Sequence, residues 1–127
     1  LSIYNQSIKI NYVSPEELAI PDDIKNYVNN NQSEYYSFNR LNTLINQSDI
    51  LYLTRIQKER HHNDVFLDEY IIDNELIKDS KESLIILHPL PRNKELSTDL
   101  DDNPKSKYFD QMKNGLLIRM ALLKIFL

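Results

Sequence analysis

The sequence predicts an α/β fold, a mostly parallel open sheet with flanking helices, in a chain of 127 residues. Segments with the profile of strands alternate with segments with the profile of helices, which is the pattern of βαβ crossovers. Two of the expected strands, at 50–54 and 84–87, are short apolar runs typical of parallel strands buried on both faces. The length fits one domain, and 41% hydrophobic residues are enough for an ordinary core.

The first half of the chain begins with a strand and a helix. The segment from Ile8 to Val13 has the composition of a strand, and Ser14-Pro15 ends it with the signature of a short helical start. A second helix restarts at Pro21, with acidic residues in its first turn. We expect this helix to end at Val28. It is followed by an expected loop at 29–33, a strand at 35–38 and a helix at 40–47 with Leu41, Leu44 and Ile45 on one face.

The second half repeats the alternation of strands and helices. Its polar segment is long, and a segment of that length without regular structure is usually functional or mobile. The expected elements are a strand at 50–54, the polar segment at 56–70, a helix at 73–81 capped by Asp73, a strand at 84–87, an acidic loop at 93–104 and a terminal helix from Lys105 or Ser106. The terminal helix is apolar on more than half of its circumference, so we expect a core helix or a helix that packs on another domain.

Composition argues against several classes of protein. A net charge of −4 argues against a nucleic-acid-binding surface, and the lack of cysteine excludes disulfides and thiolate chemistry. The apolar C-terminal run is interrupted by Arg119 and Lys124, so it is too short and too charged to span a membrane. Because Gly115 is the single glycine, the sequence contains no Gly-rich phosphate-binding loop. We expect a cytoplasmic protein and, because the chain starts at Leu1 without Met, a fragment, a processed product or an excised domain.

The first motif that carries chemistry is DILYLTRIQKER, from Asp49 to Arg60. If the chain stays extended after the strand, Arg55 and Gln57 point the same way. A guanidinium can grip a carboxylate through two parallel hydrogen bonds, and Glu59 continues the alternation as an anion that could orient Arg55. From composition alone, a solvated charged loop is the favoured interpretation, because surface ion pairs are common and contribute little.

The second motif is LIILHPLPR, which ends in a Pro-X-Pro turn. Proline cannot donate a hydrogen bond to a sheet, so the strand must stop at Pro89. Two prolines fix the direction of the Leu90 carbonyl, which becomes a good acceptor for a substrate N–H, and a cis bond before one of them is plausible. The alternative is a rigid strand terminator. His88 is either an acid–base or hydrogen-bonding group of the site or a structural histidine.

Two further clusters could be interpreted as metal sites, and we expect neither to be one. His61 and His62 with Asp64 lack a third ligand at a familiar spacing, so exposed loop histidines are favoured. Asp99, Asp101 and Asp102 do not have the spacing of a calcium loop, and a solvated acidic turn near a helix start is favoured.

Taken together, LTRIQKER and HPLPR resemble the aspartate-binding half of the aspartate carbamoyltransferase family. The segment ELSTDLDDNPKSKYFDQMKNGLLIRMALL is similar to the family's stretch leading into its final helix, and the resemblance runs from IKINYVSPEEL onward. It implies a Rossmann-like domain, a homotrimer with shared active sites, L-aspartate and carbamoyl phosphate as substrates, and no metal, cofactor, nucleic acid or membrane. The implied reaction is direct displacement of phosphate by the aspartate amine.

The resemblance also implies roles for individual residues. Arg55 would bind the aspartate side-chain carboxylate, Gln57 would place the aspartate, and Glu59 would orient Arg55. The backbone oxygens of Leu90 and Pro91, after Pro89, would contact carbamoyl phosphate, with a cis bond between Leu90 and Pro91. The remaining implied assignments are Lys58 and Arg60 in a mobile loop that includes 61–70, and Arg92 and Glu95 as residues that bridge two domains.

The sequence departs from the family pattern in three places. The family's phosphate-binding Ser-Thr-Arg-Thr segment is absent, and so is the first strand of the aspartate domain with its arginine. Lys94 stands where the family commonly has an acid. We therefore expect residues 1–127 to be a partial aspartate-binding domain, inactive alone, whose helix at about 106–127 packs on an absent carbamoyl-phosphate domain. The alternatives are a non-catalytic domain with a retained fold, and an ornithine-type enzyme, which Pro89 and Arg55 disfavour.

Overall fold

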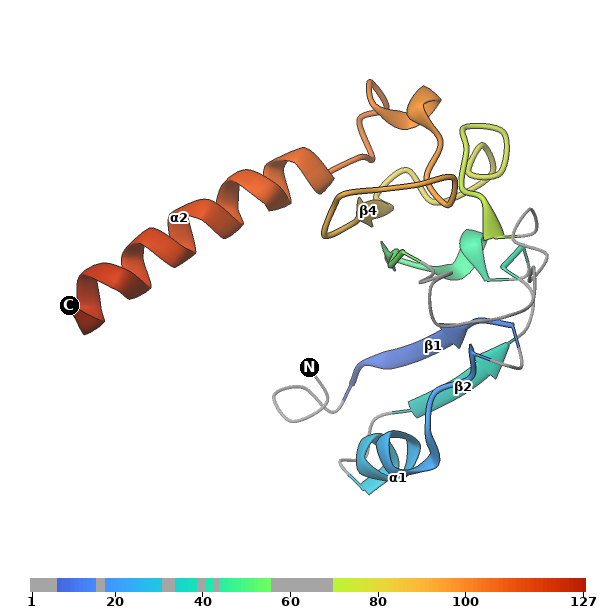
Figure 1. The fold of residues 1–127 in the computed structure, drawn as a ribbon. Coiled ribbons are helices and arrows are strands. Elements are labelled where there is room, and N and C mark those ends of the chain that lie inside the picture. Colours follow the sequence, from blue (N-terminus) through green and yellow to red (C-terminus); the bar gives the residue numbers. More distant parts are fainter. Residues whose placement is uncertain (1–6, 16–17, 31–33, 39–40, 43, 56–69) are drawn as a thin grey trace. The chain divides into compact units, whose positions relative to one another are not determined.

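A computed structural model describes residues 7–15, 18–30, 34–38, 41–42, 44–55 and 70–127. The chain divides into two compact units, Leu1–Leu44 and Ile45–Leu127, and each is described by itself. Both units contain a pair of parallel strands (Figure 1). The α/β class and the parallel pairing predicted from the sequence are confirmed.

The first unit is a strand–helix–strand arrangement. Strand β1 (Lys9–Val13) and strand β2 (Glu34–Phe38) are parallel, with Lys9 opposite Glu34 and Val13 opposite Phe38. Helix α1 (Asp22–Asn30) lies between them in the chain (Figure 1). Both predicted strands and the connecting helix are therefore confirmed.

Helix α1 begins where the sequence predicts and ends later. Asp22 and Asp23 lie in its first turn, and Lys25 Nζ pairs with Asp22 Oδ1 at 2.9 Å. The prediction that a loop begins at Asn29 is wrong, because no proline or glycine stops the helix there and it continues through Asn30. The short helical start at Ser14 is represented in the described residues by one turn, in which Leu18 N donates to Pro15 O at 3.0 Å.

The second unit is built around strand β4 (Ile85–Leu87), which has neighbours on both sides. Strand β3 (Ile50–Tyr52) runs parallel to it on one side, with Leu51 opposite Ile86. On the other side, Ile86 N donates to Lys105 O and Lys107 N donates to Ile86 O, both at 2.9 Å. Ile86 is completely buried as a result.

The prediction that both strands are buried on both faces is wrong for the described structure. Along β4 the side chains alternate, with Leu84, Ile86 and His88 buried and Ile85 38% exposed. In β3, Ile50 and Tyr52 are more than half exposed. The described residues therefore cover one face of this strand pair, and the apolar side chains of the other face are left in contact with solvent.

Two predicted helices are turns in the structure. Among the described residues of 40–47 the regular element is the 3₁₀ helix Ile45–Gln47, and at 73–81 the chain forms consecutive turns. The predicted cap is present, since Leu76 N donates to Asp73 Oδ1 at 2.8 Å. The Ser80 hydroxyl then donates to Ile77 O at 2.6 Å, a local side-chain bond of the kind that competes with helix formation. The apolar residues expected on one helix face, Leu41, Leu44 and Ile45, are buried nevertheless.

The predicted acidic loop at 93–104 forms part of the core of the second unit. Leu96 and Leu100 are buried, and a 3₁₀ turn spans Thr98–Leu100. Ile72 N donates to Glu95 O at 3.0 Å, and Ser97 N donates to Ile72 O at 2.9 Å. Leu96 and Leu100, which lie four residues apart among the acidic residues, therefore determine where this loop packs.

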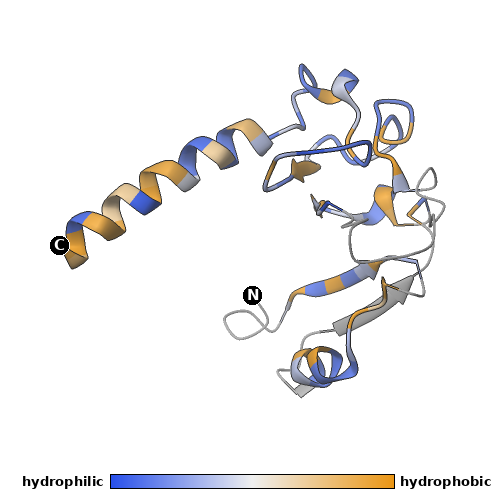
Figure 2. Cartoon of the chain, in the orientation of Figure 1, coloured by the Kyte–Doolittle hydropathy of each residue, from blue (hydrophilic) through white to orange (hydrophobic). Residues whose placement is uncertain are grey.

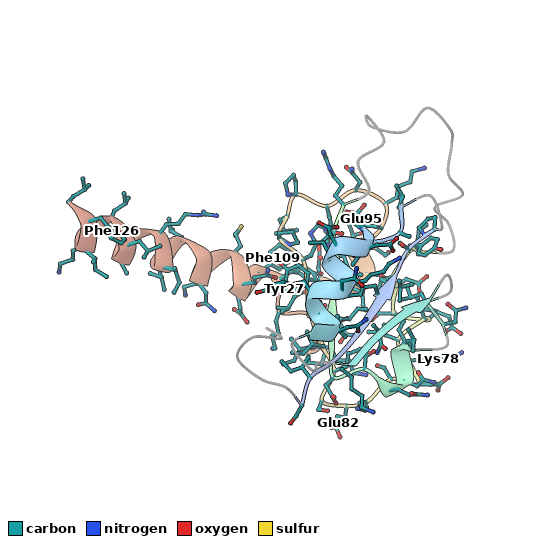
Figure 3. The ribbon with its side chains drawn as sticks, turned by 90° about the horizontal axis from the view of Figure 1, so that it is seen from below. Tyr27, Lys78, Glu82, Glu95, Phe109 and Phe126 are labelled. Atoms are coloured by element: carbon teal, nitrogen blue, oxygen red, sulfur yellow. The ribbon has the colours of Figure 1, made fainter. Side chains whose placement is uncertain are left out.

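Helix α2 (Tyr108–Phe126) begins two to three residues later than predicted. Tyr108 in its first turn is fully buried, whereas most of its other apolar residues are about half exposed or more. Apolar residues recur along its whole length, interspersed with polar ones (Figure 2), and side chains extend on either side of the helix between Phe109 and Phe126 (Figure 3). Within the described residues, no helix combines the length and apolar character needed to cross a membrane.

Candidate active site at the ends of two parallel strands

Strands β3 and β4 deliver the two sequence motifs to the same edge of their pair. The strands are parallel, and Leu53 N, one residue past the end of β3, donates to the carbonyl of Leu87, the last residue of β4, at 2.9 Å. The exposed Arg55 follows two residues after Leu53, and Pro89 follows two residues after Leu87. The opposite ends are joined by an ion pair between Lys81 Nζ and Asp49 Oδ1 at 2.6 Å. In open α/β sheets, ligands usually bind at the carboxyl ends of the strands.

Much of the first motif lies outside the described residues. The residues outside the described part include four expected site residues, the histidine cluster considered as a metal site, and all but the last residue of the expected mobile loop. The residues concerned are Gln57, Lys58, Glu59, Arg60, His61, His62, Asp64 and the segment 56–69. Their expected roles remain predictions.

The second motif forms a turn with an unusual backbone. The peptide bond between Leu90 and Pro91 is cis, as the resemblance implied. Leu90 has a φ angle of 50°, a left-handed conformation that is uncommon for a residue with a Cβ atom. Pro89 and Pro91 are exposed, and Leu90 is half-buried between them. The turn is therefore partly accessible to solvent just past the end of β4.

His88 lies beneath this turn and is 1% exposed. Its Nδ1 atom accepts a hydrogen bond from Leu90 N at 2.9 Å, and its Nε2 atom lies 3.0 Å from Glu95 Oε1. The backbone N–H of His88 donates to Gln111 Oε1 at 2.9 Å. With both ring nitrogens occupied and the ring buried, the structure favours a structural histidine over an acid–base group that reaches substrate.

Arg92 binds Asp101, a residue that the sequence analysis placed in a solvated turn. Its two terminal nitrogens face the two carboxylate oxygens, with Nη2 to Oδ2 at 2.7 Å. Tyr108 donates its hydroxyl to Asp101 Oδ1 at 2.6 Å, and the guanidinium lies 5.8 Å from the Tyr108 ring centroid. Arg92 is thus held within the second unit by the loop and by helix α2.

Charge and burial change the titration of this cluster. Hydrogen bonds from Arg92 and then Tyr108 lower the pKa of Asp101 to about 2. The Asp101 carboxylate in turn raises the pKa of Arg92 above its usual range. Burial, followed by the hydrogen bond to Asp101, raises the pKa of Tyr108. At neutral pH the cluster is therefore a guanidinium, a carboxylate and a neutral phenol.

Asp99, in the same loop, also has structural partners. Asp99 Oδ2 accepts from Asn74 N at 3.1 Å, and Asp99 O accepts from Asn74 Nδ2 at 2.6 Å. Asn103 Nδ2 donates to Asn74 Oδ1 at 2.7 Å. Within the part of the chain that the structure describes, no group of three or more histidine or acidic side chains is arranged to hold a metal ion.

Gln111 is a residue of this site that sequence reasoning missed. Its Oε1 atom accepts from His88 N, and its Nε2 atom lies 3.4 Å from the Tyr52 hydroxyl. One side chain from the first turns of α2 therefore contacts the ends of both β3 and β4. Gln111 is one of several polar residues of this helix, so nothing in the sequence set it apart or identified its partners.

Comparison with known proteins gives consistent matches over nearly the whole chain. Residues 2–126 match the family model described as "Aspartate/ornithine carbamoyltransferase, Asp/Orn binding domain". The chain is 41% identical over 115 residues to the aspartate carbamoyltransferase catalytic subunit of Finegoldia magna, covering 87% of this chain and 38% of that protein. It is 42% identical over 127 residues to the chloroplastic aspartate carbamoyltransferase of Arabidopsis thaliana, covering 96% of this chain and 33% of that protein.

The fold is also similar to that of solved aspartate transcarbamoylase structures. The crystal structure of aspartate transcarbamoylase from Trypanosoma cruzi in complex with carbamoyl phosphate and aspartate superposes with a TM-score of 0.81 at 34% identity. The match covers 91% of this chain and 40% of that chain. This chain therefore spans about two fifths or less of the length of these relatives.

Proposed function

The chain belongs to the aspartate/ornithine carbamoyltransferase family, and we propose that it forms the aspartate-binding part of an aspartate carbamoyltransferase. The observation that carries the proposal is the parallel pairing of β3 and β4, which brings Arg55 and the Pro89-Leu90-Pro91 turn to one edge. A cation for a carboxylate and a fixed carbonyl for an N–H are the two kinds of group that such an enzyme needs for aspartate and a carbamoyl group.

The proposed reaction transfers the carbamoyl group of carbamoyl phosphate to the amine of L-aspartate. The neutral amine attacks the carbamoyl carbon, a C–N bond forms, and the C–O bond to phosphate breaks as the tetrahedral intermediate collapses. The amine loses its proton, and the products are N-carbamoyl-L-aspartate and phosphate, a step of de novo pyrimidine biosynthesis. Catalysis comes from orientation and from cations near the developing negative charge.

Each side of the strand edge has a role in this proposal. Arg55 binds the side-chain carboxylate of aspartate, with Gln57 placing the substrate and Glu59 orienting Arg55. Lys58 and Arg60 belong to the same loop. On the other side, the backbone oxygens of Leu90 and Pro91 accept hydrogen bonds from the carbamoyl group.

The rest of the site is proposed to come from a carbamoyl-phosphate-binding domain and from a neighbouring subunit of a homotrimer. This chain matches only 38% of the length of the Finegoldia magna relative, and it contains no glycine-rich phosphate loop. We further propose that the apolar surface of α2 packs on that second domain, because Leu116, Leu117 and Ile118 are each more than half exposed. A cytoplasmic location remains a prediction, and a chloroplastic relative is among the proteins matched.

The test is carbamoyl transfer by the full-length enzyme, measured as radiolabelled N-carbamoyl-aspartate. Arg55→Ala should raise the KM for aspartate about 30-fold, because loss of a charge-assisted hydrogen-bonded pair costs about 2 kcal/mol. Arg55→Lys should recover part of this loss, because it keeps the charge without the paired geometry. Lys78→Ala removes an exposed cation from the turn before β4 and is the matched control.

Two alternatives are judged by the same assay. An ornithine-type enzyme would carbamoylate L-ornithine in preference to aspartate. A non-catalytic domain with a retained fold would leave the full-length protein without either activity. Arg55→Ala with an unchanged KM for aspartate would remove the assigned role of Arg55 even in an active enzyme.

A further inference from the structure

The conformation of Leu90 needs a support that the sequence motif does not by itself explain. A left-handed conformation is unfavourable for an ordinary L-residue, so surrounding contacts must hold it in place. The contact that acts directly on the Leu90 backbone is the hydrogen bond from its N–H to His88 Nδ1, at 2.9 Å. A histidine two residues earlier therefore constrains the peptide unit between Pro89 and Leu90, and with it the backbone of Leu90.

The His88 ring can accept this bond in only one protonation form. Nδ1 must carry a free lone pair, so the ring proton has to be on Nε2. Nε2 lies 3.0 Å from Glu95 Oε1, and an ionised carboxylate can only accept hydrogen bonds. Glu95 therefore selects the form of His88 that can accept from Leu90.

Glu95 is itself fixed and shielded from water. Its side chain is 10% exposed, and its Oε1 atom also accepts from Asn93 N at 2.8 Å. Asn93 lies just past the turn, so the same carboxylate oxygen binds the outgoing chain and the histidine below it. A continuous path of hydrogen bonds therefore runs from Asn93 through Glu95 and His88 to Leu90.

We infer that Glu95 and His88 are positioning residues that fix the direction of the Leu90 carbonyl. This inference rests on the proposed function, in which that carbonyl accepts a hydrogen bond from the carbamoyl group. Neither side chain touches substrate, since both are nearly buried. They act through the backbone, by keeping the turn in the one conformation that aims its oxygens at the strand edge.

Two substitutions of His88 separate positioning from simple core packing. The side-chain oxygen of asparagine occupies nearly the place of Nδ1, so His88→Asn keeps an acceptor for Leu90 N–H. The amide nitrogen of glutamine occupies nearly the place of Nε2, so His88→Gln keeps a donor to Glu95 but loses that acceptor. Both variants remove the ring. A core-packing role predicts similar losses from both, whereas the positioning role predicts different losses.

The assay measures the KM for carbamoyl phosphate, kcat and the melting temperature of the full-length enzyme. His88→Gln should raise the KM for carbamoyl phosphate at least 10-fold, and His88→Asn should change it less than threefold. Glu95→Gln, whose amide oxygen can still accept from Nε2–H, should stay close to wild type, whereas Glu95→Ala should resemble His88→Gln. Equal effects of the two His88 variants, or losses that follow the melting temperature alone, would overturn the inference.

A second measurement does not depend on activity. Nitrogen-15 NMR of the histidine-labelled enzyme should show His88 protonated on Nε2 alone in the wild type, and Glu95→Ala should abolish this uniform state. A ring protonated on Nδ1, or an unchanged signal in Glu95→Ala, would refute the hydrogen-bond path. A wild-type enzyme that shows the expected signal but no transfer to aspartate would instead refute the proposed function, and with it the catalytic purpose of the path.

Discussion

Asp101→Asn is expected to destabilise the second unit, because Asp101 accepts hydrogen bonds from both Arg92 and Tyr108. The pKa of this carboxyl falls from 3.8 to about 2 in the folded protein. Since a pKa change of one corresponds to about 1.4 kcal/mol, the full effect would be about 2 kcal/mol. A third of the Asp101 side chain is exposed, so solvent screening reduces our expected loss to about 1 kcal/mol.

The sign of the pH dependence follows from the lowered pKa. A carboxyl whose pKa is depressed by folding contributes stability above its unfolded pKa, near 3.8, and loses it as the pH falls through about 2. The difference between wild type and Asp101→Asn should therefore be constant from about pH 5 to pH 7. It should shrink as the pH is lowered from about 4 toward 2.

The assay is urea unfolding of the full-length enzyme, followed by circular dichroism at several pH values. Tyr108→Phe removes only the hydroxyl and should cost about 1 kcal/mol, because Tyr108 is fully buried. Asp102→Asn changes the exposed neighbouring acid and serves as the control, with an expected effect within about 0.5 kcal/mol. If Asp101→Asn is no more damaging than Asp102→Asn, or if its effect grows at low pH, the reasoning fails.

Three further substitutions test other parts of the unit. Leu100→Ala should cost about 3 kcal/mol, read from the urea midpoint, because Leu100 has no exposed surface. Asp73→Ala removes the acceptor for Leu76 N and should cost about 1 kcal/mol in the same assay, with the exposed Asp79→Ala as its control. Gly115→Ala should stabilise α2 in the isolated 127-residue chain by about 1 kcal/mol, seen as a gain in helical circular dichroism, because an added Cβ meets nothing within 4 Å.

The strands were predictable because their signals are local. Strand composition ended by Ser14-Pro15 identified β1, and a short apolar run ended by proline identified β4. The parallel pairing followed from the alternation of strands with helical segments. Pro89 ended β4 where a residue without an N–H must end it. The shared location of Arg55 and Leu90 beyond the ends of these two strands follows from the parallel pairing of β3 and β4 in the structure.

The contacts that hold the turn were not predictable, because their partners are distant in sequence. Gln111 lies 23 residues from His88 and 59 residues from Tyr52. Asp101 was interpreted as a solvated acid because its neighbours Asp99 and Asp102 share its charge, whereas its partner Arg92 lies in another motif. A buried tyrosine at a helix start needs a hydrogen-bond partner, and Tyr108 was the one local sign that an acid would be found nearby.

The arrangement around β4 explains why a loop rich in charged residues can hold a site rigidly. The segment 105–107 pairs with one side of β4, so the chain that leaves the Pro-Leu-Pro turn must return to the same strand within about fifteen residues. Arg92 and Asp101 join the two sides of that return, and Glu95 joins its start to His88 beneath the turn. The acids of this loop thus hold the backbone on both sides of the turn, and in our inference Glu95 acts through His88 on the conformation of Leu90.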